Sequence, residues 1–216
     1  MVKEIFFNYL PTESNIYGTE IDMKAVKIAQ YLYPRQTCNM AISGSTPCFS
    51  GDIVFGNPPF HLEWGTKEAP VSSQMYYCKK SISGTEKTGG LLVLLVSESF
   101  LSDDFSNKGD IEEINHMFNL IVQFSLPADA FKEYGVTSFR TKAMILQKKS
   151  QYVTERPYTT ELEVLKRPQE IYQTYVLPVL QERRKNAANI YFECQNTDLE
   201  AKQKQVFQEK NGETFV

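Results

Sequence analysis

Four consecutive residues early in the chain, Asn57-Pro58-Pro59-Phe60, have the side chains and carbonyl groups best suited to chemistry. They follow the apolar run of residues 53–55, which is typical of a short buried strand. The two prolines have no N–H group and hold the residues before them in extended geometry, so the turn is stiff. The Asn57 side-chain oxygen and the Pro58 carbonyl can each accept a hydrogen bond from one NH2 group, and Phe60 offers a ring face for stacking. The turn therefore suits the binding of a flat ring that carries an amine; the alternative is a plain loop that ends a strand.

An acidic strand end precedes this turn. Residues 15–22 predict a strand that closes on Glu20 and Asp22, and residues 24–33 predict a helix. The predicted apolar face of that helix comprises Ala25, Ile28, Ala29 and Leu32. A carboxylate at such a strand end is where α/β folds hold the ribose of a nucleotide-like cofactor, and Glu20 is the candidate. The alternative is a solvated acidic cap, a role that suits Asp22 as the N-cap of the helix.

The rest of the chain alternates strands with helices, which predicts an α/β fold with a mostly parallel sheet covered on both faces. The segment 61–73 is polar and irregular and predicts a mobile loop beyond a strand end, where loops commonly close over substrates. We expect a domain over residues 1–150 and a helical extension over residues 151–216, in which Pro178 interrupts a helix. Further strands are expected at 39–43, 52–56, 91–97, 120–126 and 141–147, and helices at 72–83, 111–117 and 169–188.

Composition limits the classes of function. The chain has 216 residues, 42% of them hydrophobic, with 23 basic and 26 acidic residues and a net charge of -3, so any contact with nucleic acid is expected to be local. No apolar run approaches the ~20 residues that span a bilayer, and no signal-peptide pattern is visible, which predicts a cytoplasmic protein without a membrane partner. Four cysteines and two histidines are scattered along the chain, which argues against a metal site or a disulfide framework.

In this order of motifs the chain resembles adenine-specific (N6) DNA methyltransferases, particularly those of restriction-modification systems and mobile elements. The resemblance covers roughly residues 5 to 149 and is most specific at Asn57-Pro58-Pro59-Phe60. The segments 18–22, 125–131 and 141–148 match further motifs of the family. It implies a Rossmann-like sheet, S-adenosyl-L-methionine as cofactor, and double-stranded DNA as substrate, with the target adenine flipped out of the duplex.

The resemblance also implies a set of cofactor residues. Glu20 would bind the ribose hydroxyls of S-adenosylmethionine, Ile21 would pack on its adenine, and Asp22 completes the same motif. After the third strand the family usually has an acidic residue that binds the cofactor's adenine amino group. The matching turn offers Ser45 instead, which predicts a weaker hold on that amino group.

For the target base, the resemblance implies that Asn57 and Pro58 hold the amine and that Phe60 stacks on the flipped ring, with Pro59 stiffening the turn. Phe131 in a late motif would cover the other face of the base. The transfer is a direct in-line displacement without a covalent enzyme intermediate. Positioning and polarisation of the amine would then supply most of the acceleration.

The family's first motif, a glycine-rich turn that contacts the methionine part of the cofactor, has no match in the sequence. Its strand lies in this fold between the strand of Glu20 and that of residues 52–56, so its absence predicts unpaired backbone and apolar surface there. Residues 4–9 do not replace it, because a parallel neighbour needs a crossover of a dozen or more residues and only about six lie between Tyr9 and the next predicted strand. We therefore expect a fragment, a degenerate relative or one part of a split enzyme, which does not methylate DNA without a further segment or subunit.

Two other functions fit the same residues. Asn-Pro-Pro-aromatic turns also serve methylation of glutamine amides in proteins and of amines in RNA, because the pocket only demands a planar NH2 group. A third interpretation is a non-catalytic binding module in which basic residues contact phosphates, the alternative for these residues being solvated surface. The basic residues in question are Lys142, Lys148, Lys149 and the run 183–185.

Overall fold

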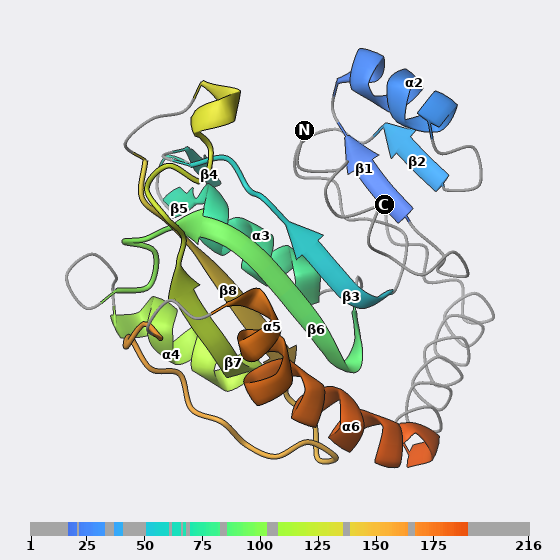
Figure 1. Ribbon diagram of the computed structural model, residues 1–216, viewed down its shortest axis with the longest axis vertical. Coiled ribbons are helices and arrows are strands. Elements are labelled where there is room, and N and C mark those ends of the chain that lie inside the picture. Colours follow the sequence, from blue (N-terminus) through green and yellow to red (C-terminus); the bar gives the residue numbers. More distant parts are fainter. Residues whose placement is uncertain are drawn as a thin grey trace, which may run out of the picture.

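The computed structural model describes residues 17–20, 22–32, 37–40, 51–60, 62–65, 67, 70–82, 86–102, 108–135, 139–163 and 167–189. Its centre is a four-stranded sheet with the strand order β3-β6-β8-β7 (Figure 1). The strands are β3 (Gly51–Gly56), β6 (Glu86–Ser97), β7 (Phe118–Ser125) and β8 (Thr141–Lys148).

The sheet is mixed in direction. Strands β3 and β6 are parallel, whereas β8 runs antiparallel to both of its neighbours, β6 and β7. The predicted α/β class is confirmed, and helices cover both faces. The sequence did not predict the direction of β8, because the link over residues 126–140 is long enough for a parallel crossover. Within the described residues of that link, the helical structure is the short 3-10 helix η1 (Lys132–Tyr134).

Two hydrophobic cores lie on opposite faces of this sheet, because successive side chains of a strand point to opposite faces. In β8, Met144 and Leu146 pack with α3 (Ser73–Ile82) and α4 (Lys108–Met117). Ile145 packs on the other face, against the C-terminal helices. Figure 1 shows α3 and α4 behind the sheet and the C-terminal helices in front of it.

The C-terminal helices form one continuous segment with a π-helical turn. It consists of α5 (Pro168–Ile171), the π turn η2 (Tyr172–Val176) and α6 (Leu177–Lys185). Pro178 has no N–H to continue an α-helical ladder, and the Leu177 N–H bonds to the Tyr172 carbonyl five residues back. The α-helical pattern is therefore interrupted directly before Pro178, as predicted, but the interruption is a π turn and the helical segment continues to Lys185. The predicted domain boundary at residue 150 stays a prediction.

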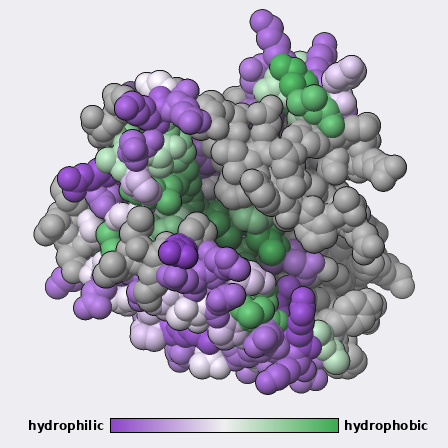
Figure 2. Space-filling model, viewed as in Figure 1, coloured by the Kyte–Doolittle hydropathy of each residue, from purple (hydrophilic) through white to green (hydrophobic). Residues whose placement is uncertain are grey.

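A smaller βαβ unit carries the acidic strand end. It comprises β1 (Tyr17–Glu20), α2 (Met23–Leu32) and β2 (Thr37–Met40), with β1 and β2 parallel. Figure 1 shows this unit on the β3 side of the four-stranded sheet, and no strand within the described ranges joins β1 to β3. On β3, Ile53 and Phe55 are 41% and 40% exposed. Figure 2 shows hydrophobic residues in the middle of the surface that faces the viewer. Apolar side chains of β3 are thus exposed, and the predicted gap between β1 and β3 stays a prediction.

Three general features complete the fold. In the part of the chain that the structure describes, no helix has the length and apolarity needed to cross a membrane. The same residues contain no cluster of three or more His, Cys, Asp and Glu side chains that could hold a metal ion. Cys78, a residue of α3, is buried in the hydrophobic core.

Candidate functional site

The Asn-Pro-Pro-Phe turn lies at the edge of the sheet where the other strand ends meet. Gly56 pairs with Leu94 near the end of β6, and Ser97 at the end of β6 pairs with Thr141 at the start of β8. Ser125 at the end of β7 pairs with the next residue of β8. We call this edge, marked by Gly56, Ser97, Ser125 and Thr141, the carboxyl edge. Open α/β sheets bind their ligands at such an edge.

Close packing fixes the turn on β3. A Cβ atom at Gly56 would lie 2.7 Å from Leu94 Cδ2, so only glycine fits there without a shift of Leu94. Pro58 is buried, whereas the Asn57 side chain is exposed at the end of the strand. Ser73 at the start of α3 donates its hydroxyl proton to the Pro59 carbonyl at 2.5 Å. The turn is therefore held in place with its amide open to a ligand.

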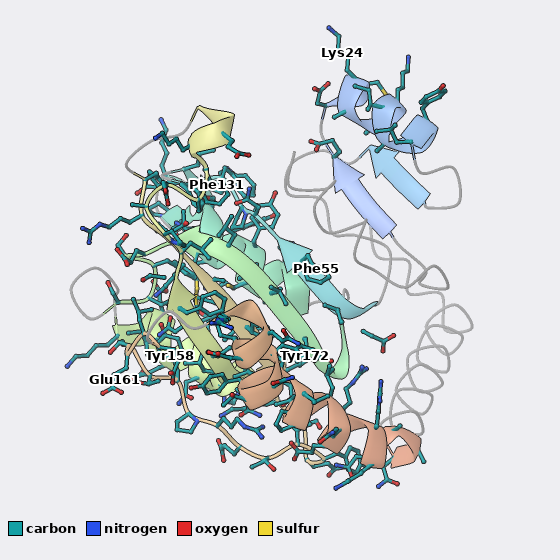
Figure 3. The ribbon with its side chains drawn as sticks, in the orientation of Figure 1. Lys24, Phe55, Phe131, Tyr158, Glu161 and Tyr172 are labelled. Atoms are coloured by element: carbon teal, nitrogen blue, oxygen red, sulfur yellow. The ribbon has the colours of Figure 1, made fainter. Side chains whose placement is uncertain are left out.

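The ring of Phe60 already has an aromatic neighbour. Phe139, just before β8, stacks on it with 4.9 Å between ring centroids and 20° between ring planes. The sequence predicted Phe131 as the second ring, and Figure 3 shows Phe131 near the same edge, at the start of η1. Its contact with a base stays a prediction. Phe139 was missed because only the fold brings it next to Phe60.

A charged cluster lies on the same edge beside the turn. Ser125 donates its hydroxyl proton to Glu98 Oε1 at 2.5 Å, and Arg140 Nη1 lies 3.7 Å from Glu98 Oε2. Lys142 is only 1% exposed. Burial lowers the pKa of Lys142 from 10.5 to about 8, and the Glu98 carboxylate opposes that shift.

The buried position of Lys142 corrects the predictions for the basic residues. Lys142 is neither solvated surface nor an exposed phosphate contact, because it occupies the same face of β8 as the buried Met144. Lys149 and Arg183 bind carboxylates of the chain, with Lys149 Nζ 2.7 Å from Glu155 Oε1 and Arg183 Nη2 2.7 Å from an oxygen of the aspartate at the start of β3. These contacts weaken the case for a phosphate-binding patch.

The segment beyond the turn is more ordered than the sequence predicted. Within residues 61–73, β4 (Glu63–Gly65) and β5 (Pro70–Ser72) form an antiparallel pair with Trp64 opposite Val71. The Ser73 N–H donates to the Leu62 carbonyl at 2.7 Å and joins this pair to α3. The prediction of an irregular loop is therefore wrong for the described part of the segment. Two strands of three residues are too short to give a recognisable alternation.

An aromatic cluster connects this pair of strands to the acidic strand end. Trp64 contacts Tyr76 edge-to-face at 4.9 Å between centroids and Tyr77 at 5.4 Å. Burial raises the pKa of Tyr77, and the Glu20 carboxylate, within electrostatic range of the phenol, adds to that rise. The cluster was not predicted as part of a site.

The predicted cofactor residues are described only in part. Glu20 is half-buried at the end of β1, next to Asp22. The Asp22 Oδ1 atom accepts a hydrogen bond from the Lys24 N–H at 2.9 Å, so its predicted role as N-cap of α2 is confirmed. Ile21 and Ser45 lie outside the described residues. A carboxylate beside a partly exposed tyrosine ring suits the hydroxyls and flat base of a nucleoside.

No protein-family model matches the chain. No curated protein sequence matches it. Among solved structures, the chain is similar to a protein from Listeria monocytogenes named as a class I S-adenosylmethionine-dependent methyltransferase, with a TM-score of 0.59 and 18% identity over 84% of this chain and 58% of that protein. It is also similar to the M protein of the type I restriction enzyme EcoKI, with a TM-score of 0.52 and 14% identity over 69% of this chain and 36% of that protein. These likenesses show the fold of the chain, which spans little more than half the length of the first protein.

Proposed function

We propose that this chain is the catalytic part of an adenine-N6 DNA methyltransferase. The observation that carries the proposal is the Asn-Pro-Pro-Phe turn at the carboxyl edge of a sheet with a methyltransferase fold, held there by Gly56 and Ser73. The fold supports the proposal, because the two similar structures are named as a methyltransferase and as the M protein of a restriction enzyme.

In this proposal the target amine is held by acceptors of the turn. The Asn57 side-chain oxygen and the Pro58 carbonyl accept the two N–H groups, which directs the nitrogen lone pair towards the methyl group. Phe60 stacks on the adenine ring. After the transfer the positively charged amine loses one proton, and solvent can accept it because Asn57 is exposed.

The cofactor proposed is S-adenosylmethionine, which supplies a methyl group on a positively charged sulfur when bound. Glu20 accepts hydrogen bonds from the ribose hydroxyls, and the partly exposed Tyr77 ring beside it offers a surface for the adenine. The separation of the β1–α2–β2 unit from β3 supports a further segment or subunit that contacts the methionine part and completes the site. Double-stranded DNA is the proposed macromolecular substrate.

Methyl transfer by the complete protein tests this function. Labelled S-adenosylmethionine is incubated with double-stranded DNA, RNA and protein substrates, and the DNA is digested to nucleosides and analysed for N6-methyladenine. We expect label in DNA adenine, lost in Asn57→Ala. Calorimetric titration with S-adenosylmethionine should show binding that Glu20→Ala weakens. Transfer to protein amides or to RNA alone would contradict the DNA assignment, and absence of cofactor binding would favour a non-catalytic module.

A further inference from the structure

Two adjacent side chains at the start of α3, Ser73 and Gln74, join the turn to the end of β6. The Ser73 hydroxyl donates to the Pro59 carbonyl at 2.5 Å. Gln74 Oε1 accepts the Ser97 N–H at 2.9 Å, and Gln74 Nε2 lies 3.2 Å from the Ser97 hydroxyl oxygen. Ser73 and Gln74 are 0% and 6% exposed, so water competes little for these bonds. One helix start thus fixes two of the strand ends that form the carboxyl edge.

The turn depends on such an outside donor because its two prolines have no N–H groups of their own. The carbonyl that Ser73 binds belongs to the peptide unit between Pro59 and Phe60. A hydrogen bond to that oxygen fixes the plane of the peptide and with it the direction in which Phe60 leaves the backbone. The carbonyl one residue earlier, of Pro58, is the one that the proposed reaction requires for the target amine.

We propose that Ser73 is a positioning residue of the target site. Its hydroxyl binds the Pro59 carbonyl and thereby sets the Phe60 ring and the Pro58 carbonyl in the orientation that a planar amine needs, while Gln74 anchors the same helix start to β6. The hydrogen bond itself is independent of the reaction; its catalytic meaning rests on the function proposed above. The substrate group that this geometry serves is an amine on a flat ring.

The neighbouring serine provides a matched control. Ser72 Oγ accepts the Met75 N–H at 3.2 Å and so caps the first turn of α3, without a bond to the Asn57–Phe60 turn. Loss of either hydroxyl removes one hydrogen bond from the same helix start. A role that is merely structural predicts similar effects of Ser72→Ala and Ser73→Ala, whereas positioning predicts a change at the turn in Ser73→Ala alone.

Nuclear magnetic resonance can observe this one peptide unit. Pro59-Phe60 is the sole Pro-Phe pair in the sequence, so the full chain labelled with 13C at proline carbonyls and 15N at phenylalanine gives a single correlation peak for it. We expect Ser73→Ala to move the Pro59 carbonyl resonance and Ser72→Ala to leave it in place. Ser73→Cys keeps the side-chain size with a weaker donor and should move the peak in the same direction by less, which provides the test if the alanine variant does not fold. A peak that stays in place in both Ser73 variants, or moves equally in Ser72→Ala, would overturn the proposal.

Methyl transfer by the complete protein with the same substitutions separates this inference from the proposed function on which it rests. We expect Ser73→Ala to lower kcat by about tenfold, the effect of losing one hydrogen bond of about 1.4 kcal/mol, with affinity for S-adenosylmethionine unchanged. An unchanged kcat in Ser73→Ala, with the carbonyl peak moved, would refute the positioning role. Absence of transfer by the unmodified complete protein would refute the proposed function instead, and the carbonyl peak would still report whether the hydrogen bond exists.

Discussion

The four-stranded sheet and the β1–α2–β2 unit each carry half of the candidate site, and they differ in how their side chains are packed. The sheet has a buried core on both faces, and its turn is braced by Ser73. In the smaller unit Val26 and Ala29 of α2 are buried, whereas Ile28 and Leu32 are 59% and 48% exposed. Figure 2 shows apolar side chains on the outer surface of that helix.

This difference indicates that the two halves contribute differently to the proposed reaction. Positioning groups on a packed scaffold are held before the substrate arrives, so the Asn57 side chain and the Pro58 carbonyl can act without reorganisation of the backbone. Glu20 lies on a unit too small to bury much apolar surface of its own. We therefore expect changes at the carboxyl edge to affect chemistry and stability strongly, and changes on the outer face of α2 to have small effects.

The largest effect is expected from Asn57→Ala. Loss of the side-chain acceptor should lower methyl transfer by roughly 10²- to 10³-fold, as removal of one preorganised polar group does in other enzymes. Because Asn57 is exposed, the free energy of unfolding should change by less than about 0.5 kcal/mol. Nucleoside analysis of methylated DNA and urea unfolding measure the two quantities. A loss of activity accompanied by a comparable loss in the free energy of unfolding would show that the turn is structural rather than catalytic.

Sequence reasoning could identify this turn because its chemistry is local. Asn57, Pro58 and Phe60 are neighbours in the chain, and Glu20 is marked by its place at a strand end. Ser73 and Phe139 were missed because each meets the turn only through the fold. Their residue types carry no signal of their own.

Two packing predictions show a related limit. The alternation in β8 places Lys142 on the core face, but the charge of lysine argued for the surface. On α2 the predicted apolar face included Ile28 and Leu32, which are exposed, while Val26 is buried. The helix covers only a pair of four-residue strands. The stripe of α2 side chains that packs on these strands is therefore narrower than the helical periodicity predicts.

The buried Lys142 predicts an unusual dependence of stability on pH. Its pKa is about 8 in the fold and ordinarily 10.5, so between these values the unfolded chain binds more protons. Stability should therefore rise with pH across that window, and below pH 8 the cost of burying the charge is fully present, about 3 kcal/mol. Urea unfolding at several pH values should show this rise in the unmodified chain and lose it in Lys142→Met.

Lys148→Met on the same strand is the matched control, because Lys148 is only half-buried at the end of β8. This variant should keep the pH dependence of the unmodified chain. Equal slopes of the free energy of unfolding against pH in all three proteins would mean that Lys142 is solvated. The carboxyl edge would then be less densely packed than we infer for the four-stranded sheet.

Gly56→Ala should destabilise the sheet by about 1–3 kcal/mol, the usual cost of overpacking. The added methyl would lie 2.7 Å from Leu94 Cδ2, and Leu94 is buried against other core residues. In a Leu94→Val background that atom is absent, so the same substitution should cost less. Urea unfolding of the four proteins in this cycle measures the coupling. Additive effects would show that Gly56 is not needed for close packing.

Phe139→Ala should make the face of Phe60 more accessible to a base. The ring pair contributes about 0.5–1.5 kcal/mol, so its removal should tighten binding of an adenine-containing oligonucleotide by about two- to tenfold. Fluorescence of 2-aminopurine at the target position measures capture of the base. Weaker binding would instead assign Phe139 to the site as the second stacking ring, in the role predicted for Phe131.

The smallest effect is expected on the outer face of α2. Because Ile28 is 59% exposed, Ile28→Glu should change the free energy of unfolding by less than about 0.5 kcal/mol. Val26 is buried, so Val26→Ala should lower the free energy of unfolding by about 0.5–1.5 kcal/mol or more, the range for removal of buried methyl groups. Both are measured by urea unfolding of the isolated chain and of the complete protein. A larger cost of Ile28→Glu in the complete protein alone would show that another segment packs on α2. The β1–α2–β2 unit would then gain part of its hydrophobic core from that segment.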